Sequence, residues 1–96
     1  MGINIKKFSA AWCPPCQMMA PEIEKLRDAH KDWVIEEIEI DSNSEESEKY
    51  DIGYVPTLII NQMGEMKRLV GFKTKEDIEK TVKEMIVNQH TKKIFR

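Results

Sequence analysis

The sequence contains only two cysteines among its 96 residues. Two cysteines cannot form the disulfide framework that stabilises a small secreted domain. The chain also lacks any apolar run near the ~18 residues that a membrane-spanning helix needs, so we expect no membrane insertion. With 15 basic and 17 acidic side chains the formal net charge is −2, which gives no basic surface for binding nucleic acid.

The first residues do not have the layout of a secretory signal. In residues 1–8 the lysines follow the first apolar side chains, and no long apolar stretch comes after them. We therefore expect a cytoplasmic protein. In that reducing compartment a close pair of cysteines is more often catalytic or metal-binding than structural. The length predicts one domain over residues 1–88, followed by a loose C-terminal tail over residues 89–96.

The apolar pattern predicts seven elements in the order strand, helix, strand, short helix, strand, strand, helix. Their ranges are 3–10, 14–29, 33–40, 42–50, 57–60, 66–70 and a last helix that follows Thr74. Thr74 and Asp77 form a weak capping box at the start of that last helix. Strands joined through a helix should be parallel, and hairpin strands antiparallel. The fold class is therefore α/β, with a four-stranded mixed sheet flanked by helices.

The two cysteines form the segment Cys13-Pro14-Pro15-Cys16 at the predicted start of the first long helix. Pro14 and Pro15 suit this first turn, where a missing N–H costs nothing. At a helix N-terminus, unpaired backbone N–H groups and the helix dipole favour thiolate over thiol. We expect Cys13 to hold that position and Cys16 to lie one turn deeper, less exposed.

This arrangement predicts a two-step exchange of thiols and disulfides. Cys13 attacks a substrate disulfide to form a mixed disulfide, and Cys16 then attacks Cys13 and releases the reduced substrate. Two other interpretations stay open. The pair could bind zinc, although structural zinc takes four ligands and only His30 and His90 could complete such a site. The two cysteines could also be unreactive core residues.

The residues around the pair resemble the thioredoxin family. The segment similar to that family's active-site helix is Trp12-Cys13-Pro14-Pro15-Cys16, followed by Met18, Ala20 and Pro21. Further matches, at the family's separations, are residues 40–43, residues 50–57, Gly64 and Gly71-Phe72. The resemblance covers roughly residues 3–87, which is nearly the whole chain.

The resemblance implies a thioredoxin-like fold in which the peptide bond before Pro56 is cis and faces the cysteine pair. In the family, the backbone of the preceding residue, here Val55, pairs with an extended substrate segment. The resemblance also implies an apolar docking patch made of Trp12, Tyr54, Val55, Gly71 and Phe72. From the residues alone, Pro56 would only begin a strand, and Tyr54 and Phe72 would be ordinary surface or core aromatics.

Two departures from the family pattern affect the site. Pro14 stands where glycine is commoner, which removes an N–H and stiffens the turn. The family usually buries an aspartate behind the second cysteine, facing a lysine on the neighbouring strand; the matching positions here hold Lys7 and Glu37. We expect Lys7 and Glu37 to form a buried pair, one of which relays the proton that Cys16 loses. Alternatively, Lys7 extends outward and Glu37 is solvated.

The resemblance thus implies a protein-disulfide reductase, an enzyme-like electron carrier that uses a redox-active Cys13–Cys16 disulfide with no bound cofactor or metal. Its expected partners are disulfide-containing proteins and a thioredoxin reductase, and we expect a monomer. A glutaredoxin recharged by glutathione is the nearest alternative. Those proteins usually have a paired glycine before the last helix, where this chain has Val70-Gly71-Phe72. A third interpretation is a binding module with incidental cysteines.

Overall fold

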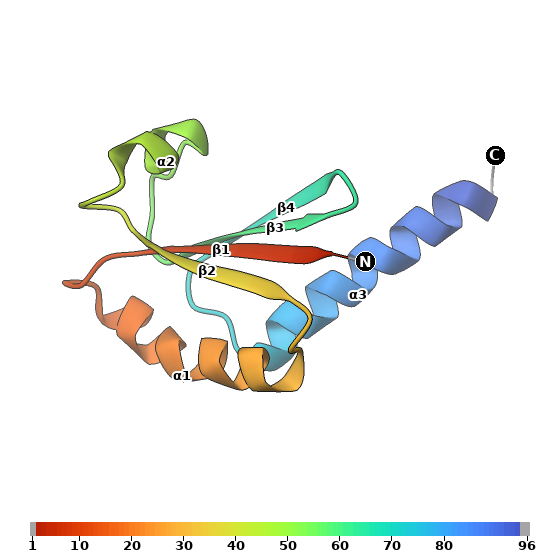
Figure 1. Cartoon of the computed structure of the whole chain (residues 1–96), viewed down its shortest axis with the longest axis horizontal. Helices are drawn as coiled ribbons and strands as arrows, with labels where there is room; N and C mark the ends of the chain where they lie inside the picture. Colours follow the sequence, from red (N-terminus) through yellow and green to blue (C-terminus); the bar gives the residue numbers. More distant parts are fainter. Residues whose placement is uncertain (1, 95–96) are drawn as a thin grey trace.

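The computed structural model describes the backbone of residues 2–94 and the side chains of residues 2–87. Within this range, seven elements follow one another in the predicted order (Figure 1). The strands are β1 (Ile3–Ser9), β2 (Val34–Glu39), β3 (Thr57–Gln62) and β4 (Glu65–Val70). The helices are α1 (Pro14–Ala29), α2 (Ser44–Lys49) and α3 (Lys75–Ile94). The described strands and helices therefore confirm the predicted order of elements.

The described strands form one mixed sheet in the order β2-β1-β3-β4. β1 and β2 are parallel, and β3 and β4 are antiparallel, which confirms both predicted pairings; β1 also pairs with β3 in antiparallel fashion. The hairpin between β3 and β4 turns at Met63 and Gly64, whose φ angles are +52° and +85°. Glycine adopts such an angle at no steric cost because it has no Cβ. β1 is thus an inner strand, and the segment that leaves it begins near the middle of the sheet.

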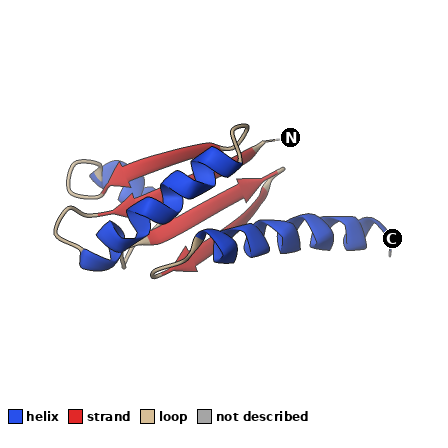
Figure 2. Ribbon diagram, turned by 90° about the horizontal axis from the view of Figure 1, so that it is seen from below, coloured by secondary structure: helices blue, strands red, loops and turns tan. Residues whose placement is uncertain are grey.

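α1 and α3 lie on the same side of the sheet in Figure 1, and α1 crosses in front of the strands in Figure 2. The buried apolar cluster on this face consists of Ile3, Ile5, Met19, Ile23, Leu26, Ile35, Leu58, Ile60, Ile78, Val82 and Met85. Its helical members recur at three- and four-residue spacing, which places them on one side of each helix. α1 continues as one helix through Pro21. This packing fixes α1 against the sheet and so fixes the start of α1, where both cysteines lie.

The shorter helix α2 lies on the opposite face of the sheet (Figure 1). It contacts the sheet through Lys6, which forms an ion pair of 2.9 Å with Glu46, and through Phe8, whose ring centroid lies 5.7 Å from that of Tyr50. Successive residues of a strand point to opposite faces. Lys6 and Phe8 therefore face α2, and Lys7 faces α1.

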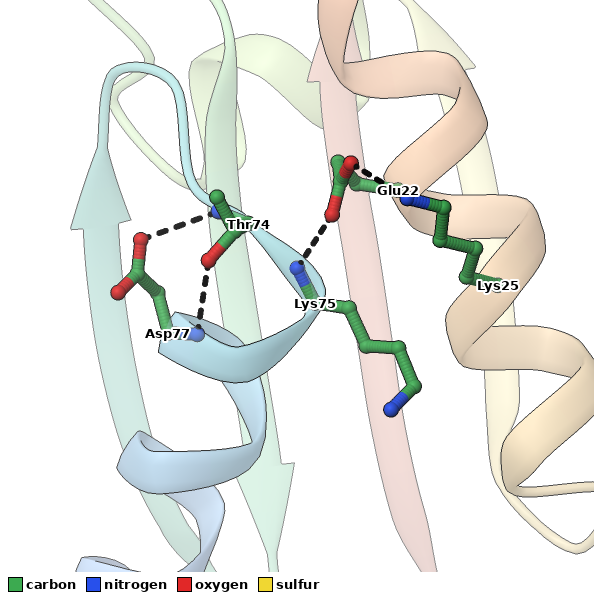
Figure 3. Close-up of polar contacts among 5 residues, drawn as sticks. All are labelled: Glu22, Lys25, Thr74, Lys75 and Asp77. Atoms are coloured by element: carbon green, nitrogen blue, oxygen red, sulfur yellow. Dashed lines mark hydrogen bonds and ion pairs between the residues drawn. The ribbon is translucent and has the colours of Figure 1, made fainter.

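Three hydrogen bonds hold the start of α3 (Figure 3). Thr74 Oγ1 accepts the Asp77 N–H at 3.1 Å, and Asp77 Oδ2 accepts the Thr74 N–H at 3.1 Å, which confirms the predicted capping box. The third acceptor comes from another helix, because Glu22 Oε1 of α1 accepts the Lys75 N–H at 2.8 Å. A single carboxylate therefore ties α1 to the first turn of α3.

The backbone near the C-terminal end of the chain is helical and does not form the loose tail that we expected. α3 continues to Ile94, so residues 89–94 are helical. In Figure 1 this part of α3 extends past the ends of the strands. The domain boundary at residue 88 stays a prediction, and residues 95 and 96 lie outside the described range.

Replacing Glu22 should reveal the strength of the link between α1 and α3. The Lys75 N–H, with help from Lys25, lowers the pKa of Glu22. A lowered folded-state pKa stabilises the fold above the unfolded pKa, and this gain is lost as pH falls through the folded pKa. Glu22→Gln should therefore lower Tm by a few degrees at about pH 7 and have no effect near about pH 2, measured by circular dichroism.

The matched control is Glu24→Gln, which removes an exposed carboxylate two positions further along the same helix. Glu24 lies 3.4 Å from Arg27, and such surface pairs contribute little to stability. We expect no change in Tm for this variant at either pH. An unchanged Tm for Glu22→Gln at neutral pH would show that the link does not stabilise the fold.

Candidate active site

The two cysteines lie where the chain leaves β1 and enters α1. Cys13 is the N-cap of α1, with extended backbone angles of φ −103° and ψ 108°, and its sulfur accepts the Cys16 N–H at 3.3 Å. Pro14 and Pro15 occupy the first two helical positions and have no N–H to donate. The first turn of α1 therefore presents the Cys16 amide to the sulfur of Cys13.

Both cysteines are free and buried, with 4% of Cys13 and 3% of Cys16 exposed. Cys16 is the less exposed thiol, as expected, but the difference is only one percentage point, because Cys13 is buried as well in a cluster against which Ile40 and Val55 pack. The two thiols differ in their surroundings instead. Burial, followed by the hydrogen bond with Cys13, raises the pKa of Cys16 to about 11, while the positive charge of Lys7 opposes this rise.

A loop that precedes β3 forms the second side of the site. The peptide bond between Val55 and Pro56 is cis, the isomer that the resemblance implied. The Cys13 thiol donates to the Val55 carbonyl oxygen at 3.6 Å, so this loop contacts the sulfur directly. On its other side the Pro56 carbonyl oxygen accepts the Gly71 N–H at 2.8 Å, and Gly71 has a φ of +93°. The Val55 carbonyl therefore contacts the Cys13 sulfur, and Gly71 is joined to the same loop through Pro56.

Three aromatic residues of the predicted docking patch are exposed at this end of the molecule. The exposed fractions are 65% for Trp12, 74% for Tyr54 and 39% for Phe72. The Trp12 indole N–H donates to Asp41 Oδ2 at 3.0 Å, which holds the ring beside the cysteine pair. Asp41 belongs to the matching segment 40–43, but its role was not foreseen. Substrate contact by Tyr54 and Phe72 stays a prediction.

Lys7 and Glu37 lie side by side in the paired strands, but their side chains do not form the expected ion pair. Among residues 2–94, no ion pair joins them, and the Glu37 carboxylate instead lies 3.9 Å from Arg27 Nη2 of α1. The alternative for Lys7 is wrong as well, since only 2% of this residue is exposed. Lys7 Nζ donates to the Cys16 carbonyl oxygen at 3.3 Å. Lys7 is thus buried against the second cysteine.

Sequence reasoning missed Glu39, which lines the same pocket as Cys16. Its Oε2 accepts the Ala11 N–H at 2.8 Å, in the segment between β1 and α1. Glu39 follows Glu37 by two positions on β2, so both side chains point toward the α1 face. The alternation of side chains along β2 was the sequence signal from which the position of Glu39 could have been predicted. A pocket of about 350 Å³ lies between Lys7, Cys16, Glu37 and Glu39.

The residues described do not gather into a metal site. Among them, no three or more His, Cys, Asp or Glu side chains cluster so that they could hold a metal ion. His30 stacks on Trp33 and lies 2.6 Å from the Glu79 carboxylate, while the side chain of His90 lies outside the described set. None of the helices within residues 2–94 is sufficiently long and apolar to span a membrane.

A cysteine pair at a helix start, beside a cis proline at one end of the inner strands of a mixed sheet, defines a thiol–disulfide oxidoreductase. The thioredoxin family model matches residues 3–84. The chain is 42% identical to a thioredoxin from Alicyclobacillus acidocaldarius subsp. acidocaldarius, covering 75% of this chain and 70% of that protein. It is 37% identical to thioredoxin from Bacillus subtilis, covering 93% and 83% respectively. The chain therefore belongs to the thioredoxin family.

Solved structures support the same assignment. Chloroplastic thioredoxin z superposes with a TM-score of 0.81 at 27% identity, covering 90% of this chain and 80% of that one. A thioredoxin from Nicotiana alata superposes with a TM-score of 0.78 at 29% identity, covering 85% and 71%. The protein is a disulfide oxidoreductase that works by dithiol–disulfide exchange through Cys13 and Cys16, and thioredoxins do this chemistry without a bound cofactor. Disulfide substrates and a reductase partner are general to the family.

The contrast between the two thiols predicts different rates of alkylation. The thiolate is the nucleophile, and a pKa of about 11 leaves only a very small thiolate fraction on Cys16 at neutral pH. Iodoacetamide should therefore modify Cys13 in a Cys16→Ser variant at least about tenfold faster than it modifies Cys16 in a Cys13→Ser variant. Mass spectrometry over time measures both rates. Equal rates in the folded variants would contradict the assigned roles, and the unfolded variants serve as the control.

Proposed function

We propose that this protein is a cytoplasmic, monomeric reductant of protein disulfides that is recharged by a thioredoxin reductase. In this cycle the Cys13–Cys16 dithiol passes two electrons to a substrate disulfide and is itself oxidised to a disulfide. The reductase then reduces this disulfide again. A monomer keeps the surface around Cys13 free for both partners. The alternatives are an oxidase, a glutathione-linked protein and a binding module.

The hydrogen bonding of the Cys13 sulfur supports the reducing direction. A thiol–disulfide protein becomes a strong oxidant when its reduced form is strongly stabilised, mainly through the thiolate. Here the Cys16 N–H is the backbone donor to Cys13 Sγ in the described structure, because Pro14 and Pro15 cannot donate. One amide stabilises a thiolate less than several amides would. The elevated pKa of Cys16 also keeps the second thiol protonated.

The loop beside the site favours a reductase over glutathione as the electron donor. Glutaredoxins usually have a glycine pair before the last helix, whereas Val70 and Phe72 flank a single glycine here. Val70 is 47% exposed and Phe72 is 39% exposed, so this segment presents apolar side chains. Apolar surface beside Cys13 suits a protein partner better than a small, charged tripeptide.

An electron-donor assay tests the proposal. Reduction of insulin disulfides should proceed with NADPH and a thioredoxin reductase, and at least about tenfold more slowly with glutathione and glutathione reductase. A redox titration against dithiothreitol should give a potential near the typical thioredoxin value of about −270 mV. A potential near about −120 mV would identify an oxidant instead. Turnover only with glutathione would overturn the choice of donor.

The double variant Cys13→Ser/Cys16→Ser separates an oxidoreductase from a binding module. It should fold, because serine is small enough for both positions, and it should lose all insulin reduction. Retention of the protein's cellular role by this variant would favour the binding module. Gel filtration of the wild-type protein tests the monomer, and fractionation of cells that express it tests the cytoplasmic location.

A further inference from the structure

A second pocket lies near the cis proline, between the segment that follows α2, the start of β3 and the end of β4. Its volume of about 480 Å³ falls within the range of ~300–1,000 Å³ that is usual for ligand sites. The lining residues are Asp51, Gly53, Tyr54, Thr57, Arg68 and Val70. The exchange between the two cysteines uses none of these side chains, so the charged part of this pocket has no role yet.

The strand register places the pocket on the sheet face that carries α2. Thr57 pairs with Phe8 of β1 on one side and with Val70 of β4 on the other. Directly paired residues point to the same face of a sheet, and Phe8 faces α2. Arg68 lies two positions before Val70 on β4, so its side chain shares that face. The pocket is therefore on the opposite side of the sheet from α1 and from the space beneath the cysteines.

The pocket is continuous with the surface around Cys13. Tyr54 is the residue before Val55, whose carbonyl oxygen accepts the Cys13 thiol at 3.6 Å. Val70 is the residue before Gly71, which is hydrogen-bonded to the same loop. Two walls of the pocket are thus the direct neighbours of residues that border the sulfur. A substrate segment attached to Cys13 therefore passes beside the mouth of the pocket.

A guanidinium group forms the charged wall of the pocket. Arg68 Nη1 donates to the Asp51 carbonyl oxygen at 3.5 Å, and Arg68 Nη2 donates to the Tyr50 carbonyl oxygen. Both acceptors are uncharged, so they hold the guanidinium in place without balancing its charge. A guanidinium has five N–H donors in a planar fork, and three of them are left for a ligand.

Within residues 2–87, no carboxylate forms an ion pair with Arg68. Asp51 lines the same pocket, but its contact with the guanidinium is through its backbone carbonyl. Glu36 and Glu46, which form ion pairs beside α2, are both bound to Lys6, at 3.2 Å and 2.9 Å. An oriented guanidinium with an unbalanced charge is suited to a carboxylate, which it can bind through two parallel hydrogen bonds.

The other walls suit an aliphatic stem that ends in such a carboxylate. Val70 is 47% exposed and Tyr54 is 74% exposed, so both present apolar surface. Thr57 is only 1% exposed, and its hydroxyl donates to the Tyr54 carbonyl oxygen at 2.7 Å, which ties the loop to β3. Because the walls are already held in place, binding requires little further ordering of the chain.

We propose that this pocket is a specificity site that binds the side chain of a glutamate or aspartate close to the reacting cysteine of the substrate. The inference rests on the proposed function as a reductant of protein disulfides. The substrate carboxylate accepts N–H groups of Arg68, while its aliphatic stem packs on Val70 and Tyr54. Arg68 binds substrate and takes no part in the exchange of bonds between sulfurs. Disulfides with an acidic neighbour are therefore reduced faster.

Single-turnover kinetics with matched peptides test the site. Each peptide carries one cysteine as a mixed disulfide with uncharged 2-thiopyridine. One position within about four residues of that cysteine, a span of about 13 Å in an extended chain, holds Glu, Gln or Lys. Cys13 attacks the peptide sulfur, forms a disulfide with it and releases pyridine-2-thione, whose absorbance reports the step. The protein is reduced beforehand, so no reductase or glutathione enters the measurement.

In the wild-type protein, at least one position should make the Glu peptide react at least about fivefold faster than the Gln peptide, through tighter binding and an unchanged maximal rate. The Lys peptide should be the slowest. Arg68→Gln should lower the Glu-to-Gln ratio below about twofold and leave the rate of the Gln peptide within about twofold of wild type. Arg68→Glu should reverse the order, so that the Lys peptide reacts fastest.

Two lysines near β4 provide matched controls. Lys67→Gln removes the same charge one position earlier, but Lys67 pairs with Ile60 and so faces the α1 side of the sheet. Lys73→Gln removes an exposed charge whose Nζ donates to the Val70 carbonyl oxygen at 3.2 Å. Both variants should keep the preference for the Glu peptide. Asp51→Asn should increase that preference, because it removes a negative charge from the pocket.

Three results would overturn the specificity site. The first is equal rates for the Glu and Gln peptides at every position in the wild-type protein. The second is an unchanged ratio in Arg68→Gln, which would assign the preference to another group. The third is a wild-type preference for the Lys peptide, which would show that Asp51 selects a basic side chain. Failure of all the peptides to react would instead contradict the proposed function, and the specificity site with it.

Discussion

The hydrogen bond from the Cys16 N–H to the Cys13 sulfur is the contact on which the site depends. It forms because two prolines at the start of α1 leave this amide as the donor nearest the sulfur. Its length of 3.3 Å is a local property of the helix start, because Cys13 is the N-cap and Cys16 lies in the first turn of the same helix. The apolar side of α1, including Met19 and Ile23, packs on the sheet. Core packing thus places this turn, with both sulfurs, at the end of β1.

The layer between α1 and the sheet is not apolar throughout. Beneath Cys16 the sheet presents Lys7, Glu37 and Glu39 where buried isoleucines would stabilise the fold more. The cost is limited because Arg27 lies near Glu37, the Ala11 N–H is bonded to Glu39, and Lys7 donates to a carbonyl oxygen. Local rules of core formation are typically broken at functional sites. Here the break coincides with the buried thiol that must lose a proton.

Sequence patterns predicted the order of the described elements, both strand pairings and the capping box of Thr74 and Asp77, because each depends on local spacing. The resemblance to the thioredoxin family placed Lys7 opposite Glu37, which the strand register confirms. Neither the patterns nor the resemblance could show that Arg27 would lie beside the Glu37 carboxylate, since that contact requires the packed position of α1. The burial of Cys13 was missed for the same reason, because it depends on Val55, which lies 42 residues away in the chain.

The exposed fractions of the two cysteines, 4% and 3%, are nearly equal, so the roles of the thiols follow from the groups that surround each of them. As a thiol, Cys13 both donates to the Val55 carbonyl oxygen and accepts the Cys16 N–H. Loss of its proton removes the first contact and strengthens the second, because a charged acceptor forms the stronger hydrogen bond. At Cys16, a backbone hydrogen bond with Ala10 and the positive charge of Lys7 both favour the thiolate, but burial outweighs them and raises its pKa. Ionisation of Cys13 therefore also releases the Val55 carbonyl oxygen from its hydrogen bond with the thiol.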